Sequence, residues 1–207
     1  MISIKQFGLM AASGALGLTL AGCSGSDYGI FQPSPEDLCK CLPIEPAILD
    51  FRHVAKHVPI PTNIAAQEIT VETILSWTQD PVVAFDAPRS GREKDQVFHI
   101  ASAFLQQASV NGADCDVHFE ISATADKNAD RVIVETPVDS EFCSARQSAQ
   151  SQLAKHRFVL DSQHGGELPT ALPVEVLGLA FEDFDHNRGS AQVKTIWELH
   201  PAIVTIP

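Results

Sequence analysis

The sequence predicts a mainly β domain of the α+β class, built on a five-stranded, OB-like Greek-key barrel. Three observations carry this prediction. From about residue 95 to residue 207, segments that alternate apolar and polar residues are separated by turn-forming sequences. One helical segment interrupts them between the third and fourth strands. The alternative, a β-sandwich, needs about seven strands, and five are indicated here.

The expected strands are defined by their alternation and by the turns between them. Their ranges are 97–105, 116–122, 131–135, 174–181 and 194–199. Turn chemistry is found at Asn111-Gly112 and over 126–130, and a loop is expected around Gly165-Gly166 and Pro169. Pro201 is expected to end the last strand, because proline cannot donate a ladder hydrogen bond.

Helices are expected to be few and mostly short. The segment 144–156 is rich in Ala, Gln and Ser, with Ser144 as a candidate cap and basic residues in its last turn. A short helix is expected over 69–78. A shorter helical turn is expected within 49–63, where His53 and His57 have helical spacing before two prolines.

Length, composition and charge indicate one globular domain, expected over residues 49–207. The chain has 207 residues, of which 44% are hydrophobic, enough for one modest core. Residues 23–48 are rich in Pro, Gly and Ser and predict a flexible tether. The formal net charge is −12, which repels phosphate backbones and argues against nucleic acid as a partner.

The N-terminus predicts a signal peptide over residues 1–22, with Lys5 before an apolar stretch. The sequence Leu20-Ala21-Gly22-Cys23 resembles the lipobox of bacterial lipoproteins. That resemblance implies cleavage before Cys23, lipid on its thiol and a membrane-anchored place in a bacterial cell envelope. Ser24, rather than Asp, implies the outer membrane if the organism has two membranes. The alternative is an ordinary secretory signal that contains a cysteine.

Four further cysteines suit an oxidising compartment. Cys39, Cys41, Cys115 and Cys143 permit two disulfides in three connectivities, and at least one is expected to tie the N-terminal segment to the domain. A zinc site is the alternative, but Cys39 and Cys41 are too close in sequence for a zinc knuckle.

Four short motifs follow one another along the second half of the chain. They are Asp114-Cys115-Asp116-Val117-His118, Ile133–Pro137 with Cys143, 174–183 with His186, and Glu198-Leu199-His200-Pro201. Together they resemble an uncharacterised family of bacterial lipoproteins and extracellular proteins, over roughly residues 70–207. The resemblance implies an OB-like barrel but no biochemical function.

The polar motif residues predict a candidate site. Strand alternation places Asp116 with His118, and Glu198 with His200, on the face that does not fill the barrel. These four residues are candidate ligands for a metal or small molecule, and the wider set adds Glu135, Asp183, Asp185 and His186. A divalent metal, calcium or zinc, is one interpretation. The favoured alternative is a set of structural hydrogen bonds that brace the strand ends.

The sequence favours a non-enzymatic binding or structural module of the envelope, with a protein or glycan as partner. It contains no Gly-x-Ser-x-Gly elbow and no Gly-rich phosphate loop, so no catalytic residues are assigned and no cofactor beyond the divalent metal named above is considered. One alternative is a metal-dependent hydrolase or nuclease that uses the Asp/His/Glu cluster. Another is a carbohydrate binder of the envelope.

Overall fold

The computed structural model describes residues 36–44, 46–79, 83–94, 96–185 and 189–207. The chain divides into two compact units, Met1–Pro33 and Ser34–Pro207, and the second contains everything described below. The predicted signal peptide, Cys23 and His186 lie outside the described residues.

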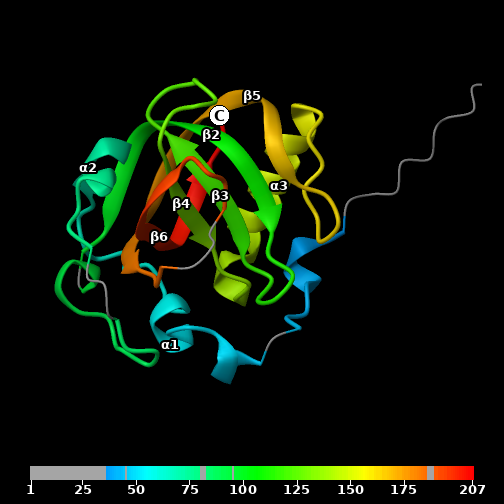
Figure 1. Ribbon diagram of the computed structural model, residues 1–207. Coiled ribbons are helices and arrows are strands. Elements are labelled where there is room, and N and C mark those ends of the chain that lie inside the picture. Colours follow the sequence, from blue (N-terminus) through cyan, green and yellow to red (C-terminus); the bar gives the residue numbers. More distant parts are fainter. Residues whose placement is uncertain (1–35, 45, 80–82, 95, 186–188) are drawn as a thin grey trace, which may run out of the picture. The chain divides into compact units, whose positions relative to one another are not determined.

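Five strands form a closed barrel, which confirms the predicted fold class (Figure 1). They are β2 (Phe98–Val110), β3 (Val117–Ser122), β4 (Arg131–Thr136), β5 (Gly166–Glu182) and β6 (Val193–Thr205). Neighbouring strands follow the order β2-β3-β4-β6-β5, and the pairing of β5 with β2 closes the ring. β4 and β6 are parallel, and the other pairs are antiparallel. A short strand, β1 (Gln67–Glu68), lies parallel to β2.

The helices are short, apart from one. The N-terminal part contains η1 (Leu38–Lys40), η2 (Ala47–Leu49), α1 (His53–Lys56), α2 (Val71–Leu75) and η3 (Gly91–Glu93). Between β4 and β5, η4 (Ser140–Phe142) leads directly into α3 (Cys143–Lys155). Because α3 continues from η4, it begins one residue early and Ser144 does not cap it.

The helix expected over 69–78 is wrong at its beginning. α2 starts after Thr70, whose side chain accepts a hydrogen bond from the Thr73 amide. Ile69 is extended instead, because its amide donates to the His99 carbonyl of β2. Strand pairing therefore replaces the expected first helical turn.

Three strand boundaries also differ from expectation. β2 continues to Val110, five residues past its expected end. The other two boundaries involve proline. β5 begins at Gly166, so the expected loop is strand; Pro169 falls between the paired residues Glu167 and Leu172, where the register shifts. β6 continues past Pro201 to Thr205, and Pro201 lies within a second register shift. A bulge needs no ladder hydrogen bond from the proline, so the chain continues as strand at both places.

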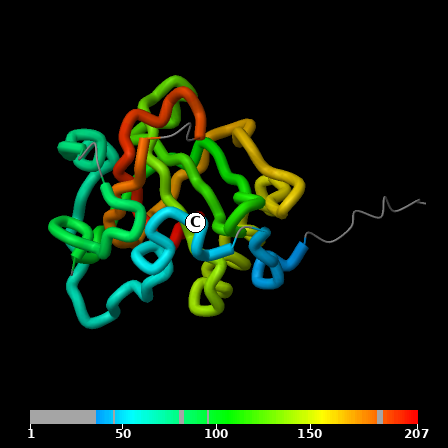
Figure 2. Tube along the Cα trace, turned by 60° about the horizontal axis from the view of Figure 1, so that its bottom comes forward, coloured from blue at the N-terminus to red at the C-terminus, as the bar shows by residue number. Residues whose placement is uncertain are grey.

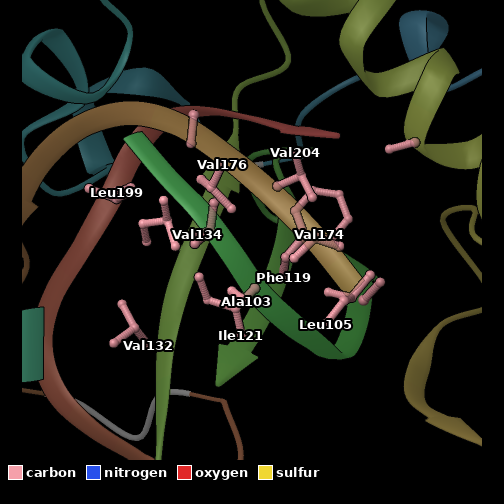
Figure 3. Packing of buried hydrophobic residues seen from close by; sticks show 14 of the residues in the cluster. Ala103, Leu105, Phe119, Ile121, Val132, Val134, Val174, Val176, Leu199 and Val204 are labelled. Atoms are coloured by element: carbon pink, nitrogen blue, oxygen red, sulfur yellow. The ribbon is translucent and has the colours of Figure 1, made fainter. Parts of the chain in front are cut away.

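The barrel interior is an apolar core. Side chains from every barrel strand meet in it (Figure 3), including Phe119 and Ile121 of β3, Val134 of β4 and Leu199 of β6. Each of these four side chains is at most 1% exposed. Burial of this apolar surface is the main stabilising contribution to the fold.

Two disulfides join the N-terminal segment to the barrel domain. Cys39 pairs with Cys143 at the start of α3, and Cys41 pairs with Cys115 just before β3. Leu38, the residue before Cys39, is 1% exposed and belongs to the hydrophobic core cluster. Among the described residues, no helix has the length and apolar character needed to cross a bilayer.

Candidate functional site

The outer face of three adjacent barrel strands is charged and yet buried. His118 and Glu120 alternate with core residues on β3, Glu135 lies on β4, and Glu198 and His200 lie on β6. Of these, Glu120 and His200 are 0% exposed and Glu198 is 1% exposed. Alternation places these side chains opposite the core, but something other than the barrel must bury them.

The N-terminal segment provides that cover. Residues 47–58, which include α1, and residues 83–93 pass over one end of the barrel (Figure 2). Arg52 fastens them: its guanidinium makes two hydrogen bonds, of 2.6 and 2.7 Å, to the Glu93 carboxylate and donates to the Glu182 carbonyl at 2.8 Å. Arg89 donates to the carbonyls of Ala55 at 2.5 Å and His200 at 3.1 Å. Both arginines therefore tie the cover to the barrel strands.

Acidic and basic groups alternate across this covered face. His200 Nε2 lies 3.1 Å from Asp116 Oδ2, and His200 Nδ1 lies 3.0 Å from Glu135 Oε2. The other oxygen of Glu135 lies 2.8 Å from His118 Nδ1, whose Nε2 is 3.7 Å from Glu120 Oε1. The result is a row of ion pairs across β3, β4 and β6.

The row keeps its histidines protonated. Burial alone lowers the pKa of His118, but the nearby carboxylates of Glu120 and Glu135 outweigh it and raise the pKa to about 9. The pKa of His200 is raised well above its ordinary value, because Asp116, Glu135 and Glu198 outweigh its burial. The two histidines in turn hold the pKa of Glu135 well below its ordinary range, against the effect of burial.

The row ends in a buried arginine. Arg131 Nη1 lies 3.0 Å from Glu120 Oε2, and both side chains are at most 1% exposed. Glu120 also accepts hydrogen bonds from the amide and hydroxyl of Ser190, at 2.6 and 2.5 Å. Burial raises the pKa of Glu120, but His118, Ser190 and Arg131 outweigh it and lower the pKa to about 2.

A polar cavity of about 360 Å³ opens beside this row, between the cover and the barrel. Its lining contains five carboxyl groups and two basic groups: Asp50, Asp114, Glu135, Asp183, Glu198, Lys56 and His118. The ammonium of Lys56 comes from α1 and lies 3.1 Å from Asp50 Oδ1. The lining therefore carries more acidic than basic groups.

The acidic excess appears in the pKa values. Burial lowers the pKa of Lys56, but Glu135 and Glu198 lead the carboxylates that outweigh it and raise it. Burial, together with the charges of Asp116 and Glu135, raises the pKa of Asp114 to about 7. A carboxyl group that resists ionisation marks a place where an added positive charge is stabilised.

Apolar side chains form the rim of the same cavity. Phe85 and Phe184 are 47% and 43% exposed, and Leu49 is 59% exposed. Phe51 packs between the aromatic pair, with ring centroids 4.7 Å from Phe184 and 5.8 Å from Phe85. The site thus combines an acidic interior with an exposed aromatic rim.

A larger cavity of about 630 Å³ lies on another side of α1. Its lining is mostly apolar and includes Ile48, Val54, Val58 and Pro88. The larger space therefore offers apolar surface, whereas the convergent polar groups line the smaller cavity.

The structure brings most of the predicted site residues together. Asp116, His118, Glu135, Glu198 and His200 form the covered row, and Asp183 lines the cavity beside it. Asp185 is exposed and does not contribute to the cavity lining.

Several residues of the site were not predicted. Glu120 follows His118 by two positions, so the same alternation could have identified it. Asp50 and Lys56 come from the cover, and nothing in their local sequence indicates that they face β4 and β6.

Asp116, Glu135 and His200 each offer one potential metal-ligand atom, and these atoms lie within 4.8 Å of one another. Each ring nitrogen of His200 faces a carboxylate, so a metal would first have to displace a proton that these carboxylates hold. As it stands, the arrangement provides charge-assisted contacts between strands.

Comparisons with models of known protein families, with characterised proteins and with solved structures found no match to this chain. The relation to a family of bacterial extracellular proteins therefore stays a prediction from the motifs.

Proposed function

We propose that this chain is a lipid-anchored, non-enzymatic binding module of a bacterial cell envelope, and that its ligand is a small organic cation held in the acidic cavity. The single observation that carries the proposal is this cavity, with five carboxyl groups inside and exposed aromatic residues at its rim.

The position of the cavity supports a binding role by analogy. OB-folds commonly bind ligands on the face of their second and third barrel strands, together with the loops between strands one and two and between strands four and five. Here these strands are β3 and β4, which contribute His118 and Glu135. The two loops contribute Asn111 and Gly189.

The ligand class follows from the lining. Carboxylates attract an ammonium group, and aromatic rings at the rim add a favourable face for a cation or an apolar portion of the ligand. The Lys56 ammonium already lies among these carboxylates, 3.1 Å from Asp50, which indicates the charge that the lining accepts. Amines and amino sugars share this chemistry.

A binding role fits the row of ion pairs better than hydrolysis does. His118 and His200 lie between carboxylates that raise the pKa of each ring. A protonated imidazole must lose its proton before it can act as a general base or bind a metal. The metal-dependent hydrolase suggested by the sequence therefore lacks support from these two histidines.

Calorimetric titration tests the ligand class with matched pairs. Glucosamine and putrescine are expected to bind with one site, and glucose is not. Asp114→Asn keeps the side chain's size and one acceptor oxygen but replaces the ionisable carboxyl group with a neutral amide, so it is expected to weaken amine binding about fivefold. Asp185→Asn, exposed and outside the cavity, is the control. Binding of glucose as tight as that of glucosamine, or no binding of either amine, would contradict the proposal.

The anchor is tested separately. Cells that express the chain are fed a labelled fatty acid, and label is expected on the wild-type protein but not on Cys23→Ser. Two or three acyl chains suffice for stable membrane attachment. A wild-type protein without label would refute the anchor and leave the ligand test unaffected.

A further inference from the structure

We infer that Asp50, His53 and His57 of the cover form a binding site for a divalent transition-metal ion, separate from the cluster that the sequence suggested. All three residues line one small cavity of about 80 Å³. Each offers one potential ligand atom, and the three atoms lie within 4.8 Å of one another.

Local geometry brings the two imidazoles together. His53 is the first residue of α1 and His57 follows its last, so the two are four positions apart on one helical face. Their ring centroids are 4.0 Å apart. Two histidines at this spacing on one helix face are a common arrangement for holding a metal between them.

The carboxylate of Asp50 completes the set. Its Oδ2 atom lies 2.9 Å from His53 Nδ1 and 3.6 Å from His57 Nε2. Its other oxygen is 3.1 Å from the Lys56 ammonium, which fixes the orientation of the carboxylate. One oxygen is therefore directed at the two imidazoles.

His57 provides an independent sign of a missing ligand. Its side chain is 7% exposed, and Nε2 is buried without a hydrogen-bond partner among the residues that the structure describes. A buried polar atom without a partner is costly, and a metal ion at this atom would remove that cost.

The opposite nitrogen of His57 is already held in the manner of a metal ligand. Nδ1 lies 2.6 Å from Asp139 Oδ2, and Asp139 is 37% exposed. Metal-binding histidines usually donate their second N–H to a carboxylate, which fixes the ring and leaves the other nitrogen for the metal. Asp139 is the positioning residue of this site.

The donor set selects the ion. Two imidazole nitrogens and one carboxylate suit zinc and its late first-row neighbours, whereas calcium and magnesium prefer oxygen ligands alone. His53 is 36% exposed, so an ion can reach the site from solvent. The nearby carboxyl group of Asp114 lines the same cavity.

A second Asp/His pair in the chain provides a matched control. His164 Nδ1 lies 2.8 Å from Asp161 Oδ1 with the same spacing of three residues as His53 and Asp50. It is 61% exposed, and the described residues place no other imidazole in a cluster with it. The Asp50–His53 pair has a second imidazole beside it, that of His57 with its partner Asp139, and the Asp161–His164 pair has none among the described residues.

The test is calorimetric titration of the full chain with zinc chloride. One site is expected for the wild type and for His164→Asn. His53→Asn is expected to lower the affinity at least about tenfold, and Asp139→Asn about tenfold, because lost ligands and lost outer partners both weaken metal sites. In a second titration, cobalt chloride replaces zinc chloride. The wild type is expected to develop the visible absorption bands of cobalt bound by nitrogen ligands, and His53→Asn is expected to lack them.

Three results would overturn the inference. The first is a wild type that binds no zinc with a defined stoichiometry. The second is equal affinity of His53→Asn and His164→Asn. The third is zinc binding that His118→Asn abolishes and His53→Asn leaves intact, which would place the ion in the covered row. Circular dichroism of each variant confirms that it is folded.

Discussion

On β3, β4 and β6, the two faces of the barrel strands are both largely buried and are chemically opposite. Inward side chains such as Phe119 and Val134 are apolar, while outward ones such as Glu120 and His200 are charged, and all four are at most 1% exposed. The inner face is closed by the barrel itself, and the outer face by residues 47–58 and 83–93 together with Gly189 and Ser190, which cover Glu120.

The two faces are stabilised in different ways, because one buries apolar side chains and the other buries charges. Apolar contacts are non-directional, so the core requires size and shape. Buried charges are stable only when each one meets a partner with good geometry, since desolvation otherwise exceeds the attraction. The stability of the outer face therefore depends on how the partners of each buried charge are positioned. Because burying these charges is costly, the outer face is the better candidate for a functional site.

The largest expected effect is on the inner face. Phe119→Ala leaves a cavity in the core and is expected to lower the free energy of unfolding by about 3–5 kcal/mol. Phe85→Ala, at the exposed rim, is the control and is expected to lower it by less than about 1 kcal/mol. Denaturation by urea measures both. Equal losses would show that the barrel interior is not the main source of stability.

A charge pair of the outer face should behave differently. Arg131→Met leaves Glu120 buried without its 3.0 Å partner and is expected to cost about 3 kcal/mol. Replacing both residues, with Glu120→Leu and Arg131→Met, removes the unpaired charge and is expected to recover at least half of that loss. A double variant as unstable as the sum of the two single variants would contradict this account.

The outer face also predicts how stability depends on pH. The pKa of His118 is raised to about 9 from an ordinary value of 6.5, so its contribution is complete below pH 6.5 and is lost as the pH rises through 9. The loss is expected to be about 3 kcal/mol. Glu120, with a pKa of about 2, acts in the opposite sense and loses its contribution below pH 4.5.

Urea midpoints measured from pH 4 to pH 10 test this dependence. His118→Gln is the control, because it cannot titrate and should flatten the alkaline decline. An unchanged decline in that variant would assign the loss to other groups.

The smallest expected effect on stability is at the rim of the cavity. Phe184→Ala removes a side chain that is 43% exposed, so the free energy of unfolding should change by less than about 1 kcal/mol. Binding of glucosamine should weaken about threefold, because an aromatic contact to the cation is lost. Val159→Ala, 44% exposed and outside the cavity lining, should change neither quantity.

Much of the barrel could be predicted, because strand alternation is a local signal. It placed His118 opposite Phe119 and His200 opposite Leu199, and the helix after the third strand fixed the order of elements. The beginning of β5 and the end of β6 were not predicted, because Pro169 and Pro201 lie in register shifts that depend on the partner strand. The alternation of β3 also extends to Glu120, which the motifs did not include.

The sequence by itself determined the fold class and the polar side of the barrel strands, and it predicted at least one disulfide between the N-terminal segment and the domain. The tertiary structure decided which cysteines pair and which segment covers that polar side. It also decided that Lys56 of the cover lies near Glu135 and Glu198 of the barrel, with Asp50 lining the same cavity. The physical reason is range: backbone periodicity acts over a few residues, whereas a buried charge is satisfied by partners that only the closed fold brings within a few ångströms.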